Sequence, residues 1–248
     1  MKKFYLKICL GILLVMSVLL FFLKRKEPIR ETPQITEKET ETVTAVSTEL
    51  PEPQYTMVID AGHGGVDPGK VGVNDVLEKD INLAVAQKLK VCMEKENIRV
   101  VMTRESDTGL YEETDTNKKR TDMAKRCQMI KEAEAVLTVS IHQNSFTDES
   151  VSGPQVFYYE GSKEGERAAV CLQEVLNTYL EIAEPRETKA NTSYYMLKKS
   201  SVPAVIVECG FLSNPTEAEK LADAVYQQKI AEALTRGILE FLKGDSSS

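Results

Sequence analysis

The stretch TMVIDAGHGGVDPG, residues 56–69, joins a short hydrophobic run to a loop rich in glycine. The run that ends at Asp60 has the length and composition of a buried strand. In an open α/β sheet, ligands bind where parallel strands end, and glycine lets the backbone come close to them. The stretch therefore predicts a strand followed by a binding loop that carries His63. A phosphate loop is disfavoured, because neither Gly-Lys-Ser/Thr nor an immediate helix follows the glycines. A plain glycine-rich turn is the structural alternative.

Outward from this stretch, short β-branched runs alternate with longer segments of helical period, which is typical of parallel strands joined by crossover helices. We expect strands at residues 56–60, 99–103, 136–141, 155–159 and 204–208. Helices are expected at residues 78–96, 118–133, 165–180 and 224–242, with a shorter one starting at Asn214-Pro215. No Pro-rich or Gly-rich break divides the region. The prediction is a single doubly wound α/β domain over residues 55–243, with a mostly parallel central sheet flanked by helices.

The sequence contains only two histidines, and each follows a hydrophobic run. His63 lies in the glycine loop, and His142 follows the run that ends at Ile141. Because the carboxyl ends of parallel strands converge, the two imidazoles are candidates for a shared metal site. Hydrolytic zinc sites have three protein ligands and leave one position open. Glu78, where the loop meets the first helix, is the best third ligand, although Asp80 suits a helix start equally well.

Glu208 ends the apolar run Ala204–Val207. Period-two alternation places its side chain on the same face as Ala204 and Ile206. A carboxylate in such a run is costly unless it is paired or associated with a metal. We therefore expect Glu208 to act as a general base beside the metal site.

The N-terminal segment differs from the rest. Residues 8–23 are uncharged and, with Phe4-Tyr5-Leu6 across Lys7, make about 20 residues, the length of a membrane-spanning helix. No small-residue cleavage site follows, so we expect an uncleaved anchor over residues 1–26. Residues 27–54 are rich in Glu, Thr and Pro and are expected to form a disordered tether, and residues 244–248 a disordered tail. Basic residues flank both ends of the apolar run, so charge does not set its orientation.

The net charge of −7 is unevenly distributed along the 248 residues. Residues 1–30 hold seven basic residues and one acidic residue, whereas the region after residue 54 is acidic and has no basic run. This distribution argues against nucleic acid as a partner, since binding to phosphates needs clustered Lys and Arg. The body's four cysteines are too far apart in sequence for a zinc knuckle or a redox motif. Buried free thiols are expected, although a location outside the membrane would permit disulfides.

Five ordered motifs carry a resemblance to a known family. They are Val58–Gly65 (VIDAGHGG), Glu78–Ala84 (EKDINLA), Met102–Arg104 (MTR), Ser140–Asn144 (SIHQN) and Val207–Pro215 (VECGFLSNP). The region from Tyr55 to Lys243 resembles the zinc-dependent N-acetylmuramoyl-L-alanine amidases, the type 3 amidases of bacterial cell-wall metabolism. The short anchored form and the last motif resemble the spore-cortex, germination-specific branch of that family.

The resemblance implies a peptidoglycan hydrolase with one Zn²⁺ ion, held by His63, Glu78 and His142, and with Glu208 as the catalytic residue. It implies cleavage of the amide between the lactyl group of N-acetylmuramic acid and L-alanine by zinc-activated water, with Glu208 as base and then acid. The substrate places the catalytic domain outside the cell membrane, and an activating protein partner is left open.

Two alternatives stay open from the residues. A zinc peptidase acting on the peptide stems of the wall would use the same metal ligands. A non-catalytic wall-binding or regulatory module would be expected to lack one of the four site residues, and all four are present.

Overall fold

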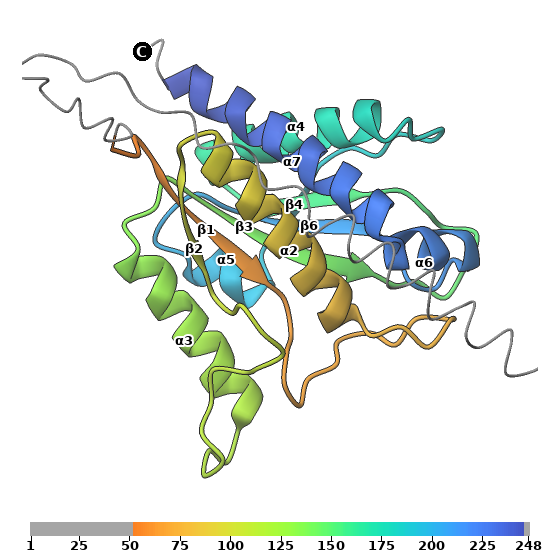
Figure 1. Cartoon of the computed structure of the whole chain (residues 1–248), viewed down its shortest axis with the longest axis horizontal. Helices are drawn as coiled ribbons and strands as arrows, with labels where there is room; N and C mark the ends of the chain where they lie inside the picture. The colour runs from red at the N-terminus through yellow and green to blue at the C-terminus, as the bar shows by residue number, and fades with distance from the viewer. Residues whose placement is uncertain (1–51, 246–248) are drawn as a thin grey trace, which may run out of the picture. The chain divides into compact units, whose positions relative to one another are not determined.

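Six strands form one sheet in the computed structural model of the chain, which describes residues 52–245 (Figure 1). The strands are β1 (Thr56–Ala61), β2 (Arg99–Met102), β3 (Leu137–Asn144), β4 (Gln155–Tyr159), β5 (Lys189–Asn191) and β6 (Ala204–Phe211). Their order across the sheet is β2-β1-β3-β6-β4-β5. Neighbouring strands are parallel except for β4 and β6, which are antiparallel. The predicted mostly parallel α/β sheet is confirmed.

Helices cover both faces of this sheet (Figure 1). One face packs against α2 (Glu78–Lys95), α4 (Lys163–Tyr179) and α7 (Ala224–Asp245), while α3 (Lys118–Glu132) and α5 (Tyr195–Lys199) cover the other. A short helix, α6 (Pro215–Ala222), follows β6. Successive side chains of a strand point to opposite faces of the sheet. In β1, Ile59 therefore packs in the core on the α2 face, whereas Val58 packs with Ile130 of α3 on the other face. The domain is therefore doubly wound, as predicted.

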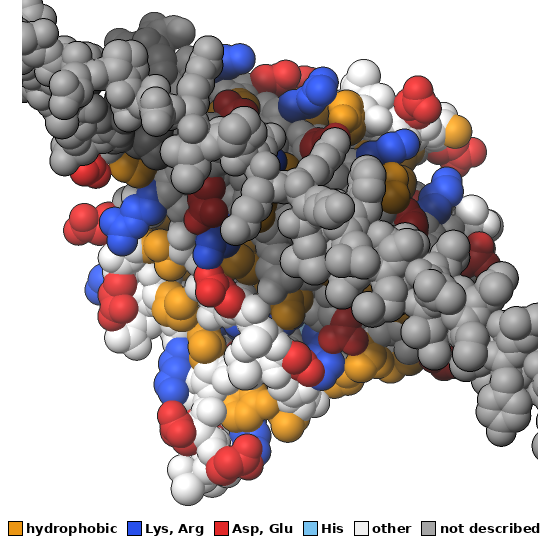
Figure 2. Space-filling view, in the orientation of Figure 1, with side chains coloured by type: hydrophobic (Ala, Val, Ile, Leu, Met, Phe, Trp, Pro, Cys, Tyr) orange, Lys and Arg blue, Asp and Glu red, His pale blue; other side chains and the backbone are white. Residues whose placement is uncertain are grey.

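The helices start where local chemistry favours a start. The Asn214 side chain accepts a hydrogen bond from the backbone N–H of Glu217 at 3.0 Å, and Pro215 occupies the first turn of α6. In α2, the side chains of Ile81, Val85 and Leu89 lie along one stripe and are buried. Acidic and basic side chains are interspersed on the surface that Figure 2 shows. At the start of α3, the half-buried Lys118 forms an ion pair with the exposed Glu113 at 2.8 Å. Solvent-exposed ion pairs contribute little to the free energy of unfolding. The fold is therefore stabilised mainly by burial of the apolar helix stripes.

Two strands run further than expected from the sequence. The apolar run of β3 ends at Ile141, yet the strand continues to Asn144, and β6 continues past Glu208 to Phe211. The reason is that backbone pairing between the two strands persists through polar residues, with His142 opposite Glu208. The prediction that His142 follows a strand and that Glu208 ends one is corrected: both lie within strands.

Two elements were not expected at all. Strand β5 has three residues and helix α5 has five, so neither is long enough to show a periodic pattern. The helix α5 matters for function, because it closes one side of the cleft described below.

Parts of the predicted domain organisation fall outside the described residues. The expected anchor at residues 1–26 and almost all of the tether at residues 27–54 lie there. Within residues 52–245, no helix combines the length and apolar character needed to span a bilayer. Helix α7 continues to Asp245, two residues beyond the predicted end of the domain at Lys243. The four cysteines of the described region, Cys92, Cys127, Cys171 and Cys209, are free thiols, as expected.

Candidate active site

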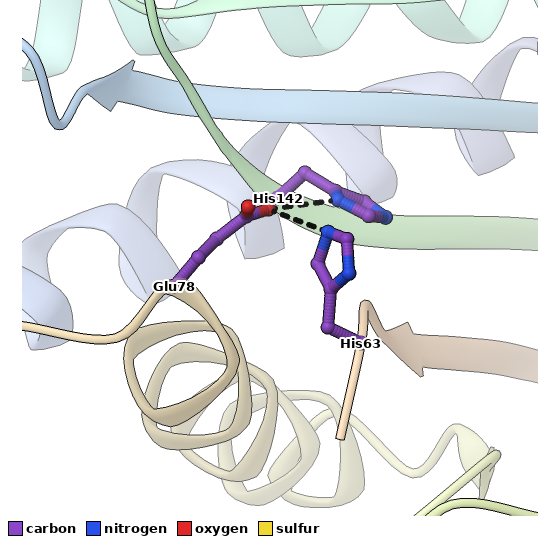
Figure 3. Close-up of side chains that lie close together, drawn as sticks. All are labelled: His63, Glu78 and His142. Atoms are coloured by element: carbon purple, nitrogen blue, oxygen red, sulfur yellow. Dashed lines mark hydrogen bonds and ion pairs between the residues drawn. The ribbon is translucent and has the colours of Figure 1, made fainter. Parts of the chain in front are cut away.

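Three candidate metal ligands from separate elements meet at the carboxyl edge of the sheet (Figure 3). His63 lies in the loop after β1, Glu78 is the first residue of α2, and His142 lies in β3. Glu78 Oε1 is 3.2 Å from His63 Nε2 and 3.0 Å from His142 Nδ1. One potential ligand atom from each residue lies within 4.8 Å of the others. Two imidazole nitrogens and a carboxylate oxygen at this spacing can hold a divalent metal ion.

The loop between β1 and α2 folds back to bring Glu78 to His63. The backbone N–H of Glu78 donates to the carbonyl of Lys70 at 2.9 Å, and Val71 pairs with Leu77. Gly69 permits this return, because a Cβ there would lie 2.6 Å from Glu78 Oε2 and its φ is +68°. Glu78 was the expected third ligand on the condition that this loop folds back, and the structure brings it to the site while Asp80 faces solvent.

The glycine loop also allows His142 to approach the backbone. A Cβ on Gly62 would lie 2.3 Å from the His142 ring, so this position cannot carry a side chain without moving the ring. The loop backbone therefore does make a close approach at Gly62. The group that it approaches is the side chain of His142, one of the three candidate metal ligands.

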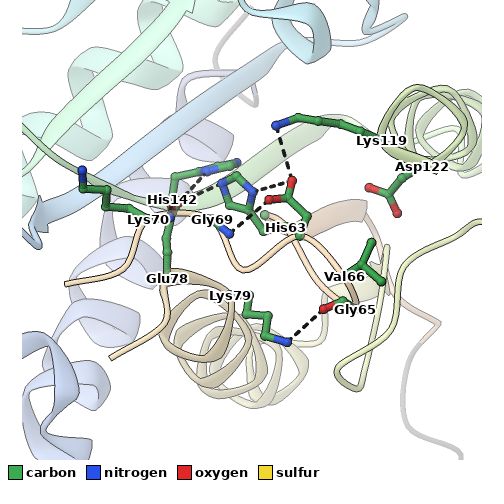
Figure 4. Close-up of polar contacts among 12 residues, drawn as sticks. His63, Gly65, Val66, Gly69, Lys70, Glu78, Lys79, Lys119, Asp122 and His142 are labelled. Atoms are coloured by element: carbon green, nitrogen blue, oxygen red, sulfur yellow. Dashed lines mark hydrogen bonds and ion pairs between the residues drawn. The ribbon is translucent and has the colours of Figure 1, made fainter. Parts of the chain in front are cut away.

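Two of the three candidate ligands, His63 and Glu78, are oriented by further polar contacts (Figure 4). His63 Nδ1 lies 2.9 Å from Asp67 Oδ2, which leaves Nε2 directed at Glu78. Glu78 Oε2 accepts from the backbone N–H of Lys70 at 2.8 Å, and Oε1 accepts from the backbone N–H of Gln143 at 3.1 Å. These contacts restrict both side chains to the geometry in which they face one another.

Electrostatics in the cluster favour charged forms despite burial. Burial alone disfavours ionisation of Glu78, but hydrogen bonds from His142 and His63 and the charges of both rings hold the pKa of Glu78 well below its usual range. Burial also favours the neutral form of His63, yet Glu78 and Asp67 outweigh it and raise the pKa of His63. A carboxylate that stays ionised is the form required of a metal ligand.

Glu208 lies on β6 directly opposite His142 on β3 and faces the same cleft. It shares its face of the sheet with Ala204 and Ile206, as strand alternation predicts. The residue is 8% exposed, and its Oε2 atom has no hydrogen-bond partner among residues 52–245. Burial, opposed by the charge of His142 and reinforced by that of Glu78, raises the pKa of Glu208 to about 7. The carboxylate is therefore poised to exchange a proton near neutral pH.

This pKa predicts a pH-dependent stability difference between the metal-free protein and its Glu208→Gln variant. The folded state binds a proton at Glu208 more tightly than the unfolded state, so ionisation costs stability as pH rises from about 4.5 through 7. The cost, on the order of 3 kcal/mol, is absent below pH 4.5 and complete above pH 7. We expect Glu208→Gln to be more stable than wild type at pH 8, with little difference at pH 4.5. Urea denaturation with a chelator present measures this, and a pH-independent difference would contradict it.

The four residues open onto a cleft with a volume of about 360 Å³. One wall of the cleft comes from α3 and the α5 region and includes Lys119, Met123, Tyr194 and Tyr195. Sequence reasoning missed this wall: α5 is too short to detect, and nothing in the sequence placed α3 over the site. Arg126, also on the wall, was missed as well. It lies four residues before the buried Ile130, so a charge on the inner face of a predicted helix was the available signal.

Comparison with known proteins agrees with this geometry. Residues 57–240 match the sequence model of a family described as N-acetylmuramoyl-L-alanine amidase. The germination-specific N-acetylmuramoyl-L-alanine amidase of Bacillus subtilis is 38% identical over 201 residues, which are 79% of this chain and 84% of the relative. The CwlD amidase of Clostridioides difficile, solved in complex with the GerS lipoprotein, is 38% identical with a TM-score of 0.74, covering 76% of this chain and 98% of that one. AmiC2 of Nostoc punctiforme is 30% identical with a TM-score of 0.69, covering 77% and 99%. The fold, the motifs and these matches show that the chain belongs to the N-acetylmuramoyl-L-alanine amidase family.

Proposed function

We propose that this amidase hydrolyses the amide between the lactyl group of N-acetylmuramic acid and L-alanine in peptidoglycan, with one Zn²⁺ held by His63, Glu78 and His142. The observation that carries the proposal is the convergence of these three side chains near the buried carboxylate of Glu208, one oxygen of which has no hydrogen-bond partner in the described part of the chain. Family membership supports the substrate and the bond.

The residues present fit a zinc ion. Two imidazoles and one carboxylate form a donor set used in hydrolytic zinc sites, with one position left for water or substrate. Both rings approach the same oxygen of Glu78, and Asp67 orients one of them from behind. When bound, zinc supplies a Lewis acid that polarises the scissile carbonyl and makes water a better nucleophile at neutral pH.

The protein's own part in the reaction centres on Glu208. Its Oε2 atom accepts no hydrogen bond from any residue between positions 52 and 245 and can accept a proton from the attacking water. The same carboxyl group then donates that proton to the departing amine nitrogen of L-alanine, and so acts as base and then acid. In the metal-free protein, burial raises the pKa of Glu208 to about 7, which brings the carboxyl group toward the range in which it can both accept and donate a proton.

Digestion of purified peptidoglycan by the purified full-length protein tests the function. Mass spectrometry of the products should show stem peptides with a free L-alanine N-terminus and glycan strands that keep intact lactyl groups. Cleavage within the stem peptide would instead identify a peptidase. Binding without any cleavage in the presence of zinc would identify a wall-binding module.

We also propose that the apolar segment at residues 8–23 anchors the enzyme in the cell membrane, with the catalytic domain on the outer, peptidoglycan-containing side. The described fold begins with β1 at Thr56, after the Glu/Thr/Pro-rich segment. We expect the full-length protein to sediment with membranes, and a protein starting at Pro53 to be soluble and to cleave peptidoglycan. If the truncated protein misfolds and adding back residues 27–54 rescues it, the tether belongs to the fold.

The similarity to a germination-specific amidase supports a role in sporulation or germination. The Clostridioides difficile relative was solved with a lipoprotein bound, which supports a protein partner for this domain in addition to peptidoglycan.

A further inference from the structure

The loop that carries His63 has an unusual backbone. His63 adopts a φ of +61°, a left-handed conformation that is unfavourable for a residue with a side chain. Such a conformation persists only when surrounding contacts hold it. The carbonyls of Ala61, Gly62 and His63, three in succession, all accept hydrogen bonds from buried arginine side chains.

Arg126 of α3 holds the His63 end of this loop. Its side chain is 1% exposed, and Nη2 donates to the His63 carbonyl at 2.6 Å. Nη1 donates to the Ala61 carbonyl and to Asp60 Oδ1, both at 2.7 Å, while Nε donates to Asp122 at 2.6 Å. Asp60 is itself 1% exposed and also accepts from Thr103 and Ser140. The guanidinium is thus fixed from two sides and has little freedom to move away from the loop.

Arg104, which follows β2, ties the same loop to the helix that carries Glu78. It is 4% exposed, and its Nε donates to the Ala61 carbonyl at 2.9 Å. Its Nη2 donates both to the Gly62 carbonyl at 3.0 Å and to the carbonyl of Lys79 at 2.8 Å. Lys79 is the residue after Glu78, so one guanidinium group spans the two segments that supply His63 and Glu78.

Stability alone is a weak reason for this arrangement. Buried charged groups are costly to desolvate, and apolar side chains of similar volume often stabilise a fold as well or better. Arginine does offer several donors in a rigid fork, which can fix the relative position of neighbouring carbonyls. We propose that Arg104 and Arg126 are positioning residues that clamp the loop and hold His63 and Glu78 in the positions needed to bind zinc. This inference rests on the proposed metal site.

The test is zinc affinity in Arg104→Lys and Arg126→Lys of the full-length protein. Lysine keeps the charge that Asp60 requires but cannot reach several carbonyls at once. We expect each variant to bind Zn²⁺ about 10- to 100-fold more weakly in competition with a chromophoric chelator, the usual effect of losing a contact behind a metal ligand. The absorption spectrum of the Co²⁺-substituted variants should change as well, because the ligand geometry changes.

Two controls separate positioning from general destabilisation. Ile238→Ala removes a fully buried side chain from α7 and should lower the unfolding temperature without changing the Kd for zinc. Arg99→Lys makes the same chemical change at an exposed arginine and should change neither the unfolding temperature nor the Kd for zinc. If one clamp variant fails to fold, the other still carries the test.

Wild-type zinc affinity in a folded clamp variant would overturn the inference for that arginine, and in both variants it would overturn the clamp. The clamp is also overturned if Ile238→Ala weakens zinc binding as much as the clamp variants do. If the wild-type protein binds no zinc, the proposed metal site is wrong, and the inference about the arginines is wrong as well. This result is distinguishable from the failures above, in which the wild-type protein does bind zinc.

Discussion

Replacing Glu208 by glutamine is expected to lower turnover by about two to four orders of magnitude, the usual contribution of general acid–base catalysis. Glutamine keeps the volume of the side chain and its ability to form hydrogen bonds, but it cannot accept a proton from water. Because Glu208 lies on β6 and is not one of the three clustered side chains, we expect zinc content and folding to survive. The proton-accepting ability that would be lost is that of the buried Oε2 atom, which has no hydrogen-bond partner among the residues that the structure describes.

Three measurements on the same preparation decide this prediction: zinc content, thermal unfolding and release of peptides with L-alanine at the N-terminus. Near-normal turnover would show that Glu208 is not the base. Loss of zinc together with activity would make Glu208 a metal ligand and would put the role of Glu78 in doubt. Leu83→Ile, a change in a partly buried residue of α2, is a control that should leave all three measurements near wild type.

Removal of any of the three clustered side chains is expected to abolish both stoichiometric zinc binding and activity. His63→Ala and His142→Ala each delete an imidazole, and two remaining ligands cannot retain the metal at ordinary zinc concentrations. Since the ligands come from three different elements, the loss of one is not compensated by its neighbours in sequence. Elemental analysis after gel filtration measures the metal, and peptidoglycan digestion measures the activity.

The chain offers a matched control for the third ligand. Glu78 and Asp80 are both acids in the first turn of α2, but only Glu78 reaches the histidines while Asp80 is exposed. Glu78→Ala should therefore lose zinc and Asp80→Ala should keep it. Retention of stoichiometric zinc by both histidine variants, or by Glu78→Ala, would contradict the assigned ligand set.

The site concentrates features that cost stability. His63 has a left-handed backbone, and Asp60 and Arg126 form an ion pair with almost no exposure. Glu208 is a buried carboxylate, and within residues 52–245 one of its oxygens has no hydrogen-bond partner. Each of these is unfavourable in isolation. Their placement around one cleft is typical of a functional site, where strain and burial preset groups for chemistry. The higher stability expected for metal-free Glu208→Gln at pH 8 is one measurable consequence.

Much of the fold was predictable because it depends on residues close together in sequence. Helix α2 was expected at residues 78–96 and is found at Glu78–Lys95, since its apolar stripe recurs every three or four residues. The start of α6 followed from Asn214 and Pro215, which act on the adjacent turn. Strand β4 was expected at residues 155–159 and lies there. These are local preferences, and a short window of sequence contains all the information they need.

The candidate site was predictable in its members but not in its geometry. His63, His142 and Glu208 stood out because histidine and glutamate next to apolar runs have few structural explanations, and Glu78 because it lies where the glycine loop meets the first helix. The sequence favoured Glu78 as the third ligand but could not show that its side chain reaches His63, because this depends on how the loop from Gly62 to Leu77 folds back. The sequence also could not show that β3 and β6 continue beyond their apolar runs, since these extensions are held by backbone pairing between the two strands.

What the sequence by itself determined is therefore the alternation of strands and helices, the family and the chemical groups available for the reaction. Only the tertiary structure decided how those groups meet: His142 contacts Glu78 across 64 positions of sequence, and Arg126 holds the carbonyl of His63 across 63. Contacts of this kind leave no periodic trace, because each side chain is placed by the packing of a whole element against the sheet. Arg126 looks in sequence like one more charged residue on a helix, and only the position of α3 over Asp60 turns it toward the loop.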